Sequence, residues 1–182
     1  MTLIARLTVI VILLLTLTGK VEAQVSTDSA KTKGEQKNTV TVVFNFEKPY
    51  YQVLFYTQLY AKKYSVPEMY LFRLLQTETG FRASDTTYDP YSVRILRTRW
   101  DGPFQMLTST ARSVWPDTLK NLTNAQFKHK MRFDLQFSTH TAVKYISTLY
   151  KKYKRWDRVF SVYNLGPKGE HVINSYAKRI TK

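Results

Sequence analysis

The sequence predicts a mostly α-helical fold, a single compact domain that follows an N-terminal export segment and a short tether. Apolar residues recur at helical spacing in several stretches after residue 49, and no run of alternating strands follows residue 46. The roughly 140 residues beyond the tether fit one hydrophobic core. The chain contains no cysteine, so disulfides and thiolate metal sites are excluded.

Residues 1–23 have the layout of a secretory signal peptide. One positive charge precedes an apolar run from Leu7 to Leu17, and small residues follow near Ala23. An uncleaved anchor is the alternative. Residues 24–45 are predicted to be a flexible basic tether with a short strand near its end, and residues 46–182 are predicted to form the main folded domain. The protein is therefore expected in the periplasm or associated with the cell envelope.

The net charge of +15 indicates attraction to a polyanion. Charge alone admits nucleic acid as a partner. The export segment favours the cell envelope instead, whose glycan carries lactyl and peptide carboxylates, so we expect no nucleic-acid partner. The alternative is that much of this charge is ordinary solvated surface.

A central helix is predicted between Ser65, which forms a capping-box pattern with Glu68, and Gly80, a natural helix stop. The spacing places Glu78 on the same face as three leucines, Leu71, Leu74 and Leu75. Burial raises the pKa of a carboxyl, as a general acid near neutral pH requires. The alternative is that Glu78 lies in the last turn and reaches water.

Further helices are predicted over residues 50–64, from residue 108 or 109, around residues 142–153 and over residues 156–163. A long loop joins Phe81 to Trp100. Its carboxylates, Asp85 and Asp89, are expected to form turns, although either could also face Glu78 across a cleft. A lone amide, Gln105, stands among apolar neighbours and must find a partner in the core or on a ligand.

Three motifs in a fixed order carry a family resemblance: Glu78-Thr79-Gly80-Phe81, Gly102-Pro103-Phe104-Gln105, and Tyr163-Asn164-Leu165-Gly166. They resemble the Glu-Ser-x-Phe, Gly-Leu-Met-Gln and Ala-Tyr-Asn-x-Gly motifs of the soluble lytic transglycosylases, glycoside hydrolase family 23. The resemblance covers most of residues 50–180 and includes a final Tyr-x-x-x-Ile at Tyr176. It implies an α+β fold like that of goose-type lysozyme, with a substrate cleft.

The resemblance also implies roles for individual residues. Glu78 is the expected catalytic acid, Tyr163 is expected to hydrogen-bond or orient it, and the residues expected to bind substrate are Thr79, Phe104, Gln105, Tyr163, Asn164 and Tyr176. No cofactor or metal is implied, and the three histidines, His129, His140 and His171, are not at ligand spacing. This sequence departs from the family at Thr79, Pro103 and Phe104, and in a longer loop that carries Arg94, Arg97 and Arg99.

The activity implied is cleavage of peptidoglycan glycan strands by a monomeric lytic transglycosylase. One carboxyl suffices for that reaction, which leaves 1,6-anhydro ends, whereas most hydrolytic glycosidases need two. A goose-type lysozyme that uses Asp85, Asp89 or Asp101 as its second carboxylate is one alternative. Another is a specialised wall-opening subunit of a secretion, conjugation or phage machine. A non-catalytic wall-binding protein is disfavoured by the acid at position 78.

Overall fold

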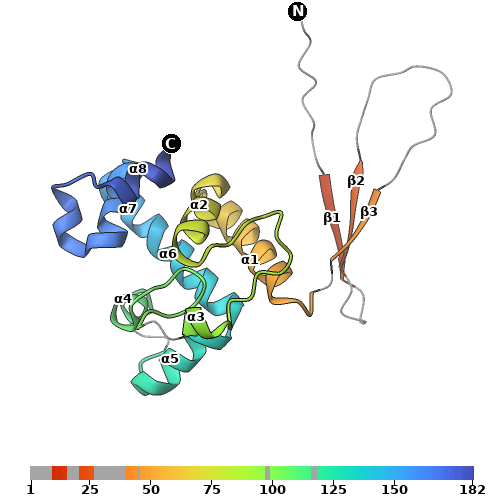
Figure 1. Ribbon diagram of the computed structural model, residues 1–182, viewed down its shortest axis with the longest axis horizontal. Helices are drawn as coiled ribbons and strands as arrows, with labels where there is room; N and C mark the ends of the chain where they lie inside the picture. Colours follow the sequence, from red (N-terminus) through yellow and green to blue (C-terminus); the bar gives the residue numbers. More distant parts are fainter. Residues whose placement is uncertain (1–9, 16–20, 27–39, 45, 97–98, 116–118) are drawn as a thin grey trace, which may run out of the picture. The chain divides into compact units, whose positions relative to one another are not determined.

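The structure, a computed structural model, describes residues 10–15, 21–26, 40–44, 46–96, 99–115 and 119–182. The chain divides into two compact units, Met1–Lys48 and Pro49–Lys182. The first unit contains an antiparallel sheet whose order is β1 (Ile10–Leu15), β2 (Val21–Ser26) and β3 (Val40–Phe44) (Figure 1). In its register Ile10 pairs with Ser26, and Val25 pairs with Val40.

Strand β3 occupies the place where the sequence predicts a short strand. Strands β1 and β2 are not anticipated by the sequence argument. Strand β1 lies within the apolar run assigned to the export signal, where isoleucine and valine favour an extended backbone. Residues 1–9, 16–20 and 27–39 lie outside the described residues. The signal peptide and the tether therefore stay predictions.

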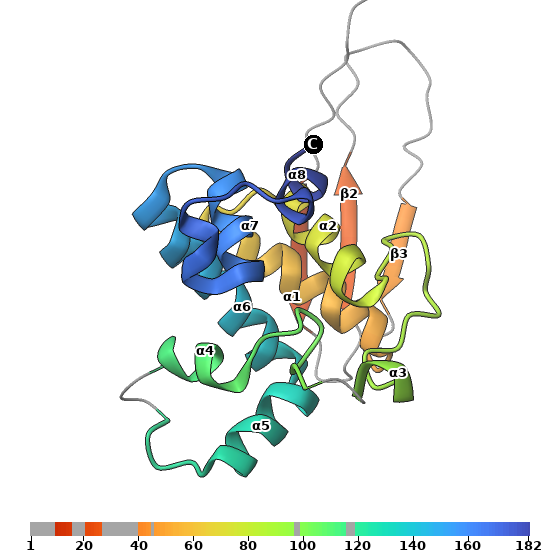
Figure 2. The same cartoon turned by 60° about the vertical axis from the view of Figure 1, so that its left-hand side comes forward.

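The second unit is helical, as predicted, and its longest helices pack directly against each other. These are α1 (Pro49–Tyr64) and α6 (Leu135–Tyr153), whose inner faces contribute Val53 and Ile146 to the core (Figure 2). The core is rich in aromatic residues, and four phenylalanines are almost completely buried: Phe81, Phe104, Phe127 and Phe160. Large rings bury much apolar area each, which suits a domain without disulfides.

The central helix, α2 (Glu68–Thr79), begins later than the sequence predicts. Ser65 does not cap it. Ser65 instead has a positive φ of 54° and closes α1, where the Val66 amide donates to the Ala61 carbonyl at 3.0 Å. The residue before α2 is Pro67, which has no side-chain hydrogen bond to offer. At the other end Gly80 stops the helix in a left-handed conformation with φ 77°, as expected.

Shorter helices follow the central one. A single turn, α3 (Val93–Leu96), interrupts the loop after α2, and α4 (Thr108–Ser113) begins where the sequence predicts. The next helix, α5 (Asn124–Phe133), was missed by the sequence argument. Its signal was present, because Thr123 and Gln126 form a complete capping box at its start.

The C-terminal part consists of α7 (Trp156–Leu165), a 3-10 turn η1 (Gly166–Glu170) and α8 (Ser175–Thr181). Helix α7 packs against η1 and α8, and α8 also contacts α2. Gly169 can only be a glycine, because a Cβ there would lie 2.2 Å from the Ser161 carbonyl oxygen. These contacts bring the chain end back to the central helix.

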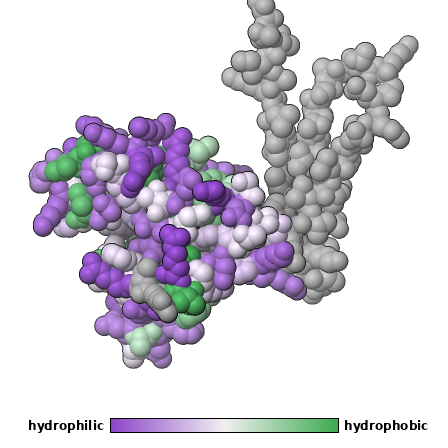
Figure 3. Space-filling model, viewed as in Figure 1, coloured by the Kyte–Doolittle hydropathy of each residue, from purple (hydrophilic) through white to green (hydrophobic). Residues whose placement is uncertain are grey.

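Hydrophilic side chains cover most of the helical unit's face shown in Figure 3, with only small separate apolar patches. In the described part of the chain, no helix is both long enough and apolar enough to span a membrane.

Candidate active site

Glu78 lies in the last turn of α2, on the face that carries the buried leucines. Leu71, Leu74 and Leu75 are fully buried, whereas Glu78 is half-buried. Both readings of the sequence are thus partly right, since the carboxyl follows the leucine stripe and still reaches the surface. Burial raises the pKa of Glu78 above its ordinary value of 4.5.

The side chain that contacts the Glu78 carboxyl directly is Tyr176. Its hydroxyl, carried by α8, donates a hydrogen bond to Glu78 Oε1. This bond favours the carboxylate and so opposes part of the rise in the Glu78 pKa that burial produces. Burial and the negative charge of Glu78 in turn raise the pKa of Tyr176, which keeps the phenol protonated as a donor.

Tyr163 has a different role from the one expected. Its hydroxyl donates to the carbonyl oxygen of Phe104 at 2.6 Å, so its single proton is already used. Burial, followed by the charge of Glu78, raises the pKa of Tyr163 well above its ordinary value. Tyr176 rather than Tyr163 makes the expected hydrogen bond to Glu78, so that part of the expectation is corrected, and an orienting role of Tyr163 stays a prediction.

A tight loop holds the carbonyl that Tyr163 binds. Asp101 and Met106 close this loop through two backbone hydrogen bonds of 2.8 and 3.0 Å. Gly102 inside it has φ 73°, and a Cβ there would lie 2.8 Å from the Met131 carbonyl oxygen, so only glycine fits. Gln105 also adopts a positive φ, and its side-chain amide donates to the Gly102 carbonyl at 2.8 Å.

Two residues expected to bind substrate are turned into the protein instead. Phe104 is only 1% exposed and belongs to the core, so it cannot form a cleft floor. Thr79 is buried, and its hydroxyl contacts the Tyr88 hydroxyl at 2.9 Å and the carbonyl oxygens of Leu75 and Pro103. These corrections share one cause, because sequence position alone does not tell on which side of a loop a side chain points. Thr79 braces the end of α2 against the loop of residues 101–106.

Asn164 is exposed at the end of α7, where its side-chain oxygen accepts a 2.9 Å hydrogen bond from Asn174. Asn174 also caps α8 by accepting from the Ala177 amide at 2.9 Å. The position of Tyr176 therefore depends on a residue that sequence reasoning missed. An asparagine directly before a helix that begins with serine was the available signal.

Tyr88 was also missed as a site residue. Besides contacting Thr79, it packs edge-to-face on Phe81 with ring centroids 5.0 Å apart, and burial raises its pKa to about 12. The sequence predicts a turn at Asp89, but it does not indicate that the neighbouring Tyr88 points inward.

The three aspartates proposed as second carboxylates all have structural partners. Asp85 accepts from the Thr87 hydroxyl at 2.6 Å, which lowers the pKa of Asp85, and Asp89 accepts from the Tyr91 amide at 2.8 Å. Asp101 is buried, pairs with Arg132 at 2.7 Å and accepts from the Thr108 hydroxyl at 2.6 Å. Each carboxylate thus serves a turn or an internal ion pair.

Among the described residues, no group of histidine, aspartate and glutamate could hold a metal ion. His140 instead stacks on Tyr60 with ring centroids 4.2 Å apart and shares a 2.6 Å hydrogen bond with Tyr64. Burial lowers the pKa of His140 to about 4, so the imidazole is neutral at physiological pH.

Of the three arginines in the long loop, the structure describes Arg94 and Arg99. Arg97 lies outside the described residues, and Arg94 is exposed on α3. Arg99 lies over the ring of Trp100, with its guanidinium carbon 4.7 Å from the ring centroid.

Comparison with known families decides the assignment. The sequence model of the family described as the transglycosylase SLT domain matches residues 55–181, which are most of the chain and nearly all of the helical unit. The chain belongs to the SLT domain family. No curated protein and no solved structure matches it. Family membership supports a lytic transglycosylase type of enzyme that acts on peptidoglycan, and Glu78 with its partner Tyr176 lies within the matched residues.

Removing the Tyr176 hydroxyl is expected to change the pH dependence of the SLT domain. Because the Tyr176 bond lowers the Glu78 pKa, Tyr176→Phe raises that pKa further. If Glu78 is the acid of the reaction, the alkaline limb of kcat/KM, which reports loss of its proton, then moves to higher pH. Tyr163→Phe is the matched control, since its hydroxyl bonds Phe104 rather than Glu78 and its loss leaves the limb in place. An alkaline limb that stayed at the same pH or moved to lower pH in Tyr176→Phe would show that the phenol does not lower the pKa of Glu78.

Proposed function

We propose that this protein is an exported lytic transglycosylase that cleaves the β-1,4 bond between N-acetylmuramic acid and N-acetylglucosamine in peptidoglycan. Glu78 is its single acid and base. The observation that carries the proposal is the half-buried Glu78 carboxyl, whose pKa burial raises, held by a protonated tyrosine in a domain of the SLT family.

The chemistry needs one carboxyl acting twice. The Glu78 carboxylic acid first donates its proton to the glycosidic oxygen as the bond from that oxygen to C1 breaks. The resulting carboxylate then accepts the proton of the muramic C6 hydroxyl as the C6 oxygen forms a bond to C1. No water is consumed, and the product is a 1,6-anhydro sugar. A raised carboxyl pKa supports the first step, because it keeps the acid protonated near neutral pH.

Tyr176 fits both steps of this cycle. Its hydroxyl donates to Glu78 Oε1 and so orients the carboxyl. It stabilises the carboxylate that remains after the first proton transfer, without being strong enough to cancel the effect of burial on the pKa. The hydrogen bonds of Thr79 and Tyr163 tie α2 and α7 to the loop of residues 101–106, which limits movement of the carboxyl relative to substrate.

A hydrolytic lysozyme is the alternative, and the aspartates test it. We expect Asp85→Asn and Asp89→Asn each to retain most of the peptidoglycan-clearing activity, because these side chains hold turns at the surface. The measurement is the release of soluble muropeptides from purified peptidoglycan, with circular dichroism as the folding control. If either variant lost activity by orders of magnitude while folded, a second carboxylate would be essential and the hydrolase would be favoured.

The net charge of +15 suits a substrate that carries carboxylates. We propose that the protein acts in the periplasm or at the cell envelope as a monomer without cofactor. Its partners are the glycan strands, with any secretion, conjugation or phage machinery as a further possibility that the sequence raises.

A further inference from the structure

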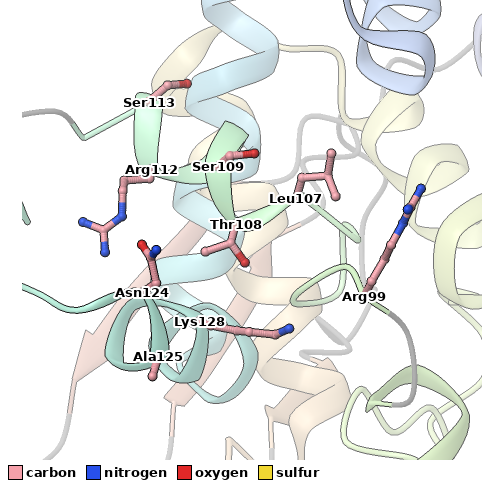
Figure 4. A pocket seen from close by; sticks show the side chains of 9 residues that line it. All are labelled: Arg99, Leu107, Thr108, Ser109, Arg112, Ser113, Asn124, Ala125 and Lys128. Atoms are coloured by element: carbon pink, nitrogen blue, oxygen red, sulfur yellow. The ribbon is translucent and has the colours of Figure 1, made fainter.

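A groove of about 820 Å³ lies between α4 and α5, separate from the side chains around Glu78. Its walls are formed by residues of both helices, by Leu107 just before α4, and by Arg99 (Figure 4). Figure 4 shows the side chains of Thr108 on α4 and Lys128 on α5 directed into the space between these helices.

The groove is strongly basic. Among the described residues that line it, Arg99, Arg112 and Lys128 are cations and none is acidic. Of its uncharged polar side chains, Ser109 and Asn124 can donate hydrogen bonds to a ligand, whereas the hydroxyls of Thr108 and Ser113 already donate to Asp101 and to the Thr110 carbonyl. In the described part of the chain, ion pairs occupy other cations (Lys130, Arg132, Lys152 and Arg155). Within the described residues, none of these ion pairs involves a cation of the groove.

One of the three cations is fixed by the fold. The guanidinium of Arg112 donates to the carbonyl oxygens of Leu122 at 2.7 Å and Thr123 at 3.1 Å, and it lies over the ring of Phe127. These bonds hold its charge in place without neutralising it. Arg112 thus supplies a preorganised positive wall, which leaves Lys128 and Arg99 to contact a ligand directly.

The groove is continuous in sequence with the loop beside Glu78. Leu107 lines the groove, whereas Phe104, three residues earlier, holds Tyr163 through its carbonyl. Because consecutive Cα atoms are about 3.8 Å apart, the Cα atoms of these two residues lie within about 11 Å of each other. One short segment therefore both braces the end of α2, through the Pro103 carbonyl, and lines the groove.

We propose that the groove between α4 and α5 binds carboxylates of the peptide that peptidoglycan carries. This inference rests on the proposed function, because a peptide attached to the bound glycan is the anion delivered nearest to Glu78. The groups that can contact such a carboxylate are the Lys128 ammonium, the exposed Arg99 guanidinium and the Ser109 hydroxyl, since backbone carbonyls already engage the Arg112 guanidinium. Binding of these carboxylates in the groove would make the enzyme prefer glycan strands that still bear peptides.

Binding should be measured in a Glu78→Gln background, so that the ligand is not cleaved. The probes are a peptidoglycan tetrasaccharide that carries its peptides and the same tetrasaccharide after an amidase has removed them. Lys128→Glu is expected to weaken binding of the first probe by about tenfold or more, the loss of one charge-assisted hydrogen bond, and to leave the second unchanged. Arg99→Glu, on an exposed side chain, is an independent second variant with the same expected direction.

The matched control is Lys151→Glu, the same charge change at an exposed position of α6 outside the groove, which should bind both probes like the parent. If Lys128→Glu and Lys151→Glu weakened the binding of both probes equally, the effect would be a general electrostatic attraction to the protein, and the proposal would be overturned. Unchanged binding of the peptide-bearing probe in Lys128→Glu and Arg99→Glu would also overturn it. Failure of the parent enzyme to cleave peptidoglycan would refute the proposed function, while a peptide-dependent difference in binding would still establish the groove.

Discussion

Glu78→Gln is expected to fold normally and to lose peptidoglycan cleavage by about 10²- to 10⁴-fold, the range typical of a lost general acid or base. The amide nearly matches the carboxyl in shape and can still accept the hydrogen bond from Tyr176. It cannot donate the proton that the leaving oxygen requires, nor take one from the attacking hydroxyl. The loss should appear in kcat rather than in substrate binding.

Thermal unfolding at several pH values provides the control for this variant. The folded-state pKa of Glu78 is raised, so its contribution to stability is present below the unfolded pKa and is lost as pH rises through the folded pKa. The Glu78→Gln variant has no carboxyl at this position and therefore does not lose stability in this way as pH rises. The Tm of Glu78→Gln relative to the parent should therefore increase from acid to neutral pH. A folded Glu78→Gln protein that kept most of its activity would exclude Glu78 as the acid.

Asp101→Ala is expected to lower the free energy of unfolding by about 3–5 kcal/mol, the usual effect of removing one partner of a buried ion pair. The Asp101 side chain is fully buried, and its two oxygens bind Arg132 and the Thr108 hydroxyl. Its loss leaves a largely buried guanidinium without this carboxylate and releases the start of α4. Urea unfolding measures the change.

Asp157→Ala is the matched control, because Asp157 also forms an ion pair with an arginine but at an exposed site, where Arg155 is 63% exposed. Its loss should be much smaller, since solvent screens exposed pairs. Equal losses in the two variants would mean that burial of Asp101 contributes nothing. Activity lost without any loss of stability would instead return Asp101 to the candidates for a second carboxylate.

The sequence predicts the parts of the site that depend on local spacing. Glu78 follows the leucines because both obey the same helical period, and Gly80 ends the helix because it tolerates a left-handed conformation. The capping box assigned to Ser65 fails for an equally local reason. Ser65 and Val66 satisfy the carbonyls at the end of α1 before α2 begins, and sequence patterns do not rank these competing hydrogen bonds.

The side chains around the carboxyl depend on contacts between distant segments and were harder to predict. Phe104 points into the core because the loop of residues 101–106 is anchored by Gly102 against α5 and α6, a contact that only the folded chain shows. The family resemblance assigns the hydrogen bond to Tyr163, whereas in the folded chain Tyr176 makes it. Which tyrosine reaches the carboxyl depends on how α7 and α8 pack, and the sequence does not show that packing.

The mass of the cleaved ends tests the single-carboxyl mechanism most directly. Purified peptidoglycan is digested with the protein, and the muropeptides are weighed by mass spectrometry. If the C6 hydroxyl is the nucleophile and Glu78 the only acid and base, the products carry 1,6-anhydro ends, one water lighter than reducing ends. Products with reducing ends alone would contradict this account and assign the protein to the hydrolytic lysozymes.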